Sequence, residues 1–394
     1  MAWLALVFWL TLRSAPAQAA TVAELRWYCI SCGAEGVADL LLNVLLFAPL
    51  GIAACGLGWS WRKTAVVFFA LSTSIEITQA TLLVGRDASL GDVLANSTGA
   101  ILGWLVLPLL IDLCHPAPRT ARRAAIVVTS LMFGTWAASG IGLRPALDGT
   151  SRWVGQLLPS SPFTEPFAGA AGRVTVNGVA ITNGPFEPPR ALADSLALTV
   201  QLTRDDTRAP RHSAVIARIK DDDGNLEVHV SQVGEALVLE ARVAGSHWLL
   251  HTPQWRFDRA LVIPLHTAWR YAWRWEPGAL VFSSGPADGS QPAVATRRKM
   301  SVASGWVFIH PFVSVVGQSQ SFWTALWLAA WFGMLGWLAG WVAARERWLI
   351  GAAALGGFVL IGGAVALPPS GIELLAAAAS YLLLAVLPRR VAAS

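Results

Sequence analysis

About eight long apolar stretches, gathered in two groups at the ends of the chain, constrain its fold more than any other feature. A stretch of about 20 apolar residues can cross a bilayer as an α-helix. The chain has 394 residues, of which 55% are hydrophobic and only 13% are charged, which is too apolar for an ordinary soluble enzyme. We therefore predict a polytopic membrane protein. The predicted spans are 2–13, 39–58, 64–84, 90–113, 124–143, 322–343, 347–367 and 371–388.

Basic residues in the loops predict how these spans are oriented. Lysines and arginines are enriched in cytoplasmic loops. Four basic clusters fall on alternate connections of the predicted spans, at 62–63, 119–123, 345–347 and 389–390. They therefore lie on one side of the membrane. We expect that side to be the cytoplasm and the membrane to be the inner (cytoplasmic) membrane of the cell. Both termini are then cytoplasmic if the first helix is uncleaved, an alternative favoured because no Lys or Arg precedes it, although residues 15–19 resemble a signal-peptidase site.

The segment 144–318 between the two groups has ordinary charge density and a different period. Short runs such as 196–202 and 226–230 are apolar or alternate, and turn residues separate them. Asp223-Gly224, between two such runs, is a strong hairpin signal. The fold class we predict is a membrane-embedded all-α helical bundle plus an extracytoplasmic all-β sandwich. The predicted domains are 1–143, 144–318 and 319–394.

Three pairs of polar residues recur at a similar height in three of the predicted spans. Their spacings of three or four residues place each pair on one helical face. An ionisable group inside a spanning helix costs roughly 2.5–3.5 kcal/mol, so such groups usually face a protein interior or a cavity. The recurrence predicts a shared polar pocket toward the outer leaflet. The pairs are Asp39 and Asn43, Glu76 and Gln79, and Asp92 and Asn96.

These pairs belong to a longer pattern that resembles the VanZ-like family over residues 1 to about 113. The pattern also includes Pro49-Leu50-Gly51, Arg86, Gly99 and Gly103. The resemblance implies a link to sensitivity to glycopeptide antibiotics such as teicoplanin, which act on cell-wall precursors at the outer face. It supplies no biochemical mechanism.

The residues themselves indicate two further features of this region. Gly99 and Gly103 lie on the same face of their helix as Asp92, so another helix could approach closely there. Arg86 lies in the short outer loop, where its guanidinium could pair with a carboxylate. The predicted ligand-binding residues are Asp39, Asn43, Glu76, Gln79, Arg86, Asp87, Asp92 and Asn96.

Three interpretations of the polar residues remain open. They could bind an amphiphilic molecule, either a membrane lipid or a lipid-linked cell-envelope precursor. They could instead form an enzyme in which Glu76 or Asp92 acts as general acid or base, or they could only hold helices together through hydrogen bonds. The chain shows no nucleophile elbow, metalloprotease motif or phosphate-binding loop, which favours binding. A transporter would need an inverted repeat, and we find none.

The middle segment resembles laminin-G-like or concanavalin-A-like sandwiches in the order of its strands, which implies binding of carbohydrate or of a protein. Four aromatic residues at 269, 271, 273 and 275 share one strand face. They could stack on sugar, but their size favours the sandwich core. Asp221, Asp222 and Asp223 could bind calcium, although a solvated hairpin tip explains them more simply. We expect no metal ion, cofactor or nucleic acid. Cys29 and Cys32 are most simply explained as residues without a chemical role, although they could form a local disulfide if their loop lies outside the cell membrane.

Overall fold

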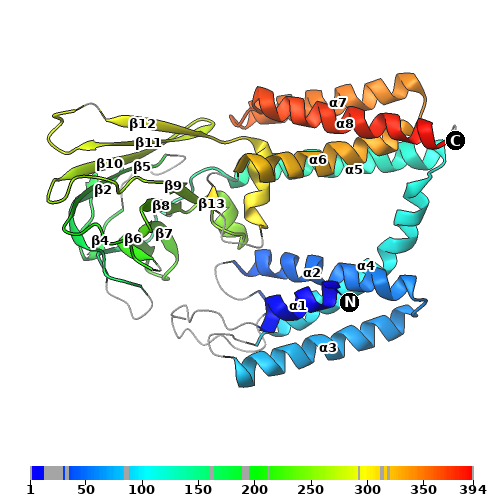
Figure 1. The fold of residues 1–394 in the computed structure, drawn as a ribbon, viewed down its shortest axis with the longest axis horizontal. Helices are drawn as coiled ribbons and strands as arrows, with labels where there is room; N and C mark the ends of the chain where they lie inside the picture. Colours follow the sequence, from blue (N-terminus) through cyan, green and yellow to red (C-terminus); the bar gives the residue numbers. More distant parts are fainter. Residues whose placement is uncertain are drawn as a thin grey trace. The chain divides into compact units, whose positions relative to one another are not determined.

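The computed structural model describes eight helices and two β-sheets within residues 2–12, 30–31, 35–83, 88–159, 164–188, 195–211, 213–291, 293–310, 315–316 and 320–392. The predicted fold class, a membrane helical bundle plus a β-sandwich, is confirmed. The chain forms two compact units (Figure 1). The first comprises Met1–Ala124, Trp248–His251 and Ile309–Pro311, and the second comprises Ala125–His247, Thr252–Phe308 and Phe312–Ser394.

Four helices of the first unit match the first four predicted spans. α2, α3 and α4 are long and apolar enough to cross a membrane, whereas α1 is shorter. Ser60 begins α3 as its N-cap, because its side chain accepts a hydrogen bond from the Lys63 N–H at 3.3 Å. The four helices are α1 (Ala2–Leu12), α2 (Gly36–Gly56), α3 (Trp61–Leu82) and α4 (Leu90–Cys114).

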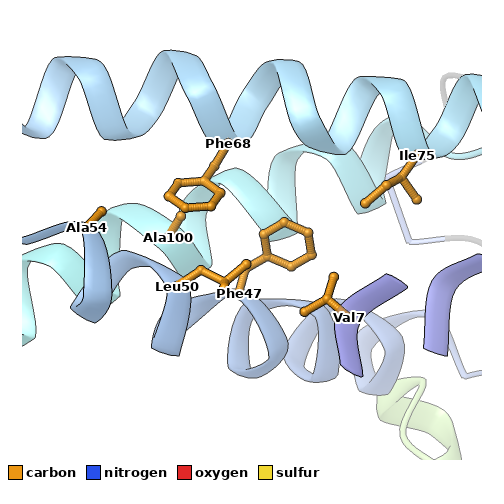
Figure 2. Packing of buried hydrophobic residues seen from close by; sticks show 7 residues of the cluster. All are labelled: Val7, Phe47, Leu50, Ala54, Phe68, Ile75 and Ala100. Carbon is orange, nitrogen blue, oxygen red and sulfur yellow. The ribbon is translucent and has the colours of Figure 1, made fainter. Parts of the chain in front are cut away.

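A small hydrophobic core joins these helices (Figure 2). Phe68 of α3 points toward α2 and α4, and its ring meets Phe47 of α2 edge-to-face, with centroids 6.4 Å apart. Val7 brings α1 into the same core. The apolar residues of four separate helices therefore pack around one centre, which fixes the helix ends where the polar pairs lie.

Glycines set the distance between α2 and α4. A Cβ atom added at Gly99 would overlap the carbonyl oxygen of Val44, and one at Gly103 would overlap that of Ala48. Gly51 of α2 makes the reciprocal contact with the Ala100 carbonyl. The predicted close approach along the Gly99 and Gly103 face is confirmed. The two backbones touch, so side chains flanking this line are held in fixed register.

The second unit contains the remaining helices. α5 begins within the first unit and passes into the second at Ala125, and α5, α6 and α7 are long and apolar enough to cross a membrane. Trp136 of α5 is fully buried and packs on Phe358 of α7, with ring centroids 4.5 Å apart. Gly336 of α6 lies against the backbone of Tyr381 in α8. The helices are α5 (Pro118–Gly142), α6 (Gln320–Gly340), α7 (Ala344–Ala364) and α8 (Gly371–Ala392).

The strands of the second unit form two sheets, in which the described pairings are antiparallel except that of β13 with β9. One sheet has the order β13 (Val315–Val316), β9 (Gln254–Phe257), β8 (Ala236–Ala241), β7 (Leu226–Val233), β6 (Ala214–Asp221), β1 (Trp153–Leu157) and β4 (Gly184–Phe186). The other has the order β12 (Val294–Lys299), β11 (Ala279–Pro286), β10 (Trp269–Glu276), β5 (Ala197–Arg204), β2 (Gly169–Val176) and β3 (Val179–Ala180).

Two local predictions for the sandwich are confirmed. Asp223-Gly224 lies in the turn between β6 and β7, and Gly224 has the positive φ of +85° that favours glycine. Tyr271 and Trp273 are buried in the core, while Trp269 and Trp275 at the two ends of the row are half-buried. The aromatic row therefore packs the sandwich. The likeness of the whole sandwich to laminin-G or concanavalin-A domains stays a prediction.

Candidate functional site

The polar pairs of the first unit lie where α2 and α4 begin and α3 ends. Asn43 Nδ2 of α2 donates a hydrogen bond of 2.6 Å to Asp92 Oδ1 in the first turn of α4. Further along α4, Gly99 and Gly103 lie against the backbone of α2 and hold the same two helices together. The packing of α2 on α4 therefore determines this amide–carboxylate pair.

Glu76 connects α3 to the beginning of α4. Its Oε2 accepts a 2.8 Å hydrogen bond from the backbone N–H of Ser89, the N-cap residue of α4. The Glu76 residue is 6% exposed. A carboxylate at a helix N-terminus satisfies an N–H that has no partner within the helix, and it also interacts favourably with the helix dipole.

Asn96 lies one turn deeper, between α4 and α3. Its Nδ2 donates to Ser72 Oγ of α3 at 2.9 Å, and the residue is 2% exposed. Its Oδ1 is buried and has no hydrogen-bond partner among the described residues. The Asn96 amide therefore presents one unused acceptor in the interior of this helix group.

Two of the predicted residues make contacts away from this cluster. Gln79 Nε2 donates to the Thr11 carbonyl at 2.8 Å, near the end of α1. Asp39 Oδ1 lies 3.9 Å from His251 Nε2, and its side chain is 61% exposed. We name Asn43, Ser72, Glu76, Asp92 and Asn96 the bundle cluster. Gln79 and Asp39 border it through partners of their own.

His251 belongs to the short segment Trp248–His251 that is part of the first unit. The Leu249 carbonyl accepts from the N–H groups of Val37 and Ala38, each at 3.1 Å, in the first turn of α2. Burial lowers the pKa of His251, but a hydrogen bond to Asp39 and the negative charges of Glu35 and Asp39 outweigh it, so its pKa is raised. The segment thus places a titratable group beside Asp39.

Some expected residues lie outside the part of the chain that the structure describes. These are Arg86 and Asp87 of the predicted pocket and the cysteines Cys29 and Cys32. Within the described residues, no group of three or more His, Cys, Asp or Glu side chains is placed to hold a metal ion.

Sequence reasoning missed several of the partners found here. The Thr11 carbonyl and the Ser89 N–H are backbone groups, which no residue pattern marks as partners. His251 is far from Asp39 along the chain, and the sequence carries no signal that would join them. The sequence does place Ser72 four residues before Glu76 on the same helical face, although Ser72 is not among the predicted ligand-binding residues.

The helices and this polar cluster define the chain as a multi-pass integral membrane protein. Residues 1–111 match the model of the VanZ/LLP1 family. These residues therefore form a VanZ-like membrane segment, and the matched range contains every member of the bundle cluster. No curated protein and no solved structure matches the chain significantly.

Proposed function

We propose that the bundle cluster binds the polar end of an amphiphilic cell-envelope molecule, either a lipid or a lipid-linked precursor. The observation that supports this most is the buried Oδ1 of Asn96, which has no hydrogen-bond partner among the described residues. A buried acceptor without a donor costs about 1–3 kcal/mol. A hydroxyl, amine or amide N–H of a ligand would remove that cost, so the ligand chemistry we propose includes a hydrogen-bond donor in its headgroup.

Pure helix stapling explains the bundle cluster less well. Hydrogen bonds between membrane helices average only about 0.6 kcal/mol, and α2 and α4 already pack closely through glycines. A chain that needed only adhesion between these helices would gain more from apolar side chains than from Glu76 and Asp92. In the proposal Gln79 and Asn96 exchange hydrogen bonds with the ligand, and Arg86 holds an anionic group.

Isosteric variants of the two carboxylates test this function. Glu76→Gln and Asp92→Asn remove charge but keep an oxygen that can accept from the Ser89 N–H and from Asn43. We expect both purified variants to fold and to retain less co-purifying envelope lipid than the parent, measured by mass spectrometry. Glu373→Gln is the matched control, because Glu373 likewise accepts a backbone N–H at a helix start, from Ser370 at 2.6 Å.

The same preparations separate the alternatives. If the variants retain lipid but no longer convert it, the protein is a membrane-embedded enzyme in which Glu76 or Asp92 moves a proton. If the variants bind and behave like the parent, the bundle cluster only staples the helices and the proposal is wrong.

The proposed setting is the inner membrane, with the bundle cluster toward the outer leaflet and residues 144–318 outside the cytoplasm. In this setting the sandwich recognises a glycan or a partner protein, and the protein alters sensitivity to glycopeptides such as teicoplanin. The alternating basic loops support this orientation.

Cysteine labelling tests the orientation. Cys114 is exposed at the end of α4, on the side proposed to be cytoplasmic, and Ser290 is exposed in the connection between β11 and β12. We expect a membrane-impermeant maleimide on intact spheroplasts to label a chain whose one cysteine is at Ser290→Cys, and to spare a chain that keeps Cys114 alone. The reverse pattern would invert the proposed topology.

A further inference from the structure

The outward face of the six-stranded sheet carries basic side chains toward one end of its strands. Arg274 of β10 and Arg297 of β12 both lie opposite Val281 of β11, so the three residues share a face. Lys299 lies two residues further along β12 on the same face. All three basic residues are exposed, and we name them the basic strip.

The register of β12 separates its three consecutive basic residues between the two faces of the sheet. Arg298, between Arg297 and Lys299, points to the opposite face, where its guanidinium lies 5.9 Å from the ring centre of Phe257. Within the strip, Glu276 accepts a hydrogen bond from Arg297 Nη1 at 2.6 Å, and Arg274 Nη2 lies 2.9 Å from its other oxygen.

The basic strip keeps a net positive charge of two, because three cations face one carboxylate. The residues directly beside the strip on this face are uncharged, namely Ala197, Thr199, Val281, Ser283 and Ala295, and the exposed Arg270 lies further along β10 on the same face. An arginine side chain has five N–H donors, so the single Glu276 orients both guanidinium groups and leaves most of their donors unused. The geometry suits a further anionic group bound beside Glu276.

This end of the sheet meets the ends of three helices within the second unit. Gln320, the first residue of α6, donates from Nε2 to the Lys299 carbonyl at 3.4 Å. Ser301 Oγ donates to Glu373 Oε1 in the first turn of α8 at 2.6 Å. A Cβ added at Gly278, in the turn between β10 and β11, would lie 3.3 Å from the Ala366 carbonyl just after α7. Lys299 is therefore placed at the end of the membrane-spanning segments.

We propose that the basic strip binds anionic phospholipid headgroups of the membrane that α6, α7 and α8 occupy. The polar layer of a bilayer is roughly 5–7 Å deep on each side. Strand residues rise by about 3.3 Å each, so Arg274 and Arg297 lie only about two residues above the level of Lys299. Each Lys or Arg close to an anionic surface strengthens binding by a factor of about five. The strip thus holds the membrane-proximal edge of the sandwich on the lipid surface.

Hydrogen exchange on the full-length protein in nanodiscs tests this proposal. We expect the backbone amides of β12, an edge strand, to exchange more slowly in nanodiscs containing phosphatidylglycerol than in phosphatidylcholine alone. The variant Arg274→Gln/Arg297→Gln/Lys299→Gln should lose this difference. Lys299→Gln alone should weaken lipid binding about fivefold, and Arg274→Lys/Arg297→Lys, which keeps the charges, should preserve the protection.

The matched control removes three exposed arginines near the opposite ends of the strands, with Arg208→Gln/Arg211→Gln/Arg259→Gln. It should leave the protection of β12 by phosphatidylglycerol unchanged. Equal exchange of parental β12 in the two lipids would overturn the proposal. Loss of the phosphatidylglycerol-dependent protection in the control variant, to the same extent as in the triple variant of the strip, would also overturn it. Protection of β12 by inorganic phosphate in phosphatidylcholine nanodiscs, without any effect of phosphatidylglycerol, would also overturn it in favour of a soluble anion.

Discussion

Each compact unit contains a buried cluster of carboxylates with polar partners, and these two clusters differ in how completely their carboxylate and amide oxygens are paired. In the sandwich, Arg242 forms ion pairs with Glu227 and with Asp221. Glu227 Oε2 also accepts from the Asp148 N–H at 2.8 Å, and both oxygens of Asp221 accept from Asn225. Every carboxylate oxygen of this sandwich cluster therefore has a donor.

The bundle cluster, in contrast, leaves the Oδ1 of Asn96 buried without a partner among the described residues. A polar network that satisfies itself rigidifies a fold, whereas an unused buried acceptor can accept a hydrogen bond from another molecule. The comparison assigns a structural role to the sandwich cluster and supports a binding role for the bundle cluster.

The largest expected effect comes from removing Arg242. Arg242→Met leaves Glu227 and Asp221, which are 0% and 4% exposed, without their guanidinium. Breaking a buried pair in this way costs about 3–5 kcal/mol. Burial already raises the pKa of Glu227, against the opposing effects of the Asp148 N–H and Arg242. We expect a large fall in the melting temperature of the sandwich, and tryptophan fluorescence during heating measures it.

The matched control for that prediction is Arg256→Met. Arg256 Nε lies 2.7 Å from Asp258 Oδ1, but the two side chains are 36% and 30% exposed. A solvent-exposed pair contributes about 0–1 kcal/mol, so this variant should melt close to the parent. Equal losses in the two variants would contradict a specific structural role for the sandwich cluster.

The next effect concerns the backbone contact that positions the bundle cluster. Gly103→Ala places a Cβ against the Ala48 carbonyl oxygen, and because backbone cannot move as freely as a side chain, we expect a loss of about 1–3 kcal/mol. Gly134→Ala in α5 is the control, since nothing lies within 4 Å of the added Cβ and alanine is the better helix former. Melting temperatures of the two purified variants should move in opposite directions.

The sequence allowed the helices and this glycine contact to be predicted because both depend on local patterns. Apolar length defines a spanning helix, and the spacing of Gly99 and Gly103 defines a face on which a second helix can approach. The hairpin at Asp223-Gly224 is local in the same sense.

The pairing inside each cluster could not be predicted, because it depends on contacts between distant segments. β1 pairs with both β6 and β4, and Asp39 meets His251 from a segment far along the chain. The unused oxygen of Asn96 depends on which rotamer lets its Nδ2 reach Ser72, and sequence spacing does not determine rotamers.

A smaller effect distinguishes a binding atom from a structural one. Replacing both partners of a buried hydrogen bond by apolar groups is nearly neutral or stabilising. We therefore expect the free energy of unfolding of Asn96→Leu/Ser72→Ala to lie within about 1 kcal/mol of the parent. The same variant should lose bound envelope lipid, measured by mass spectrometry of the purified protein. A strongly destabilised variant, or one with its lipid intact, would place Asn96 with the structural residues of the sandwich cluster.

The smallest effect tests Asp39, which borders the bundle cluster through His251. Burial lowers the pKa of His251, but the hydrogen bond to Asp39, the charges of Glu35 and Asp39 and a hydrogen bond to the His310 backbone together outweigh burial, so the pKa is raised above its ordinary value of 6.5. Protonated His251 therefore contributes stability that is fully present below pH 6.5 and is lost as pH rises through the raised pKa.

Because the Glu35 and Asp39 side chains are 46% and 61% exposed, solvent screens their charges and the contribution should stay under about 1 kcal/mol. The measurement is the difference in melting temperature between the parent and His251→Gln, taken from below pH 6.5 to above the raised pKa of His251. The same comparison is repeated in the Asp39→Asn background. We expect the parent's advantage over His251→Gln to shrink as pH rises, and to depend less on pH in the Asp39→Asn background. An advantage that is constant or grows with pH would show that His251 stays neutral in the fold, so that Asp39 would be free to serve the bundle cluster as the other predicted residues do.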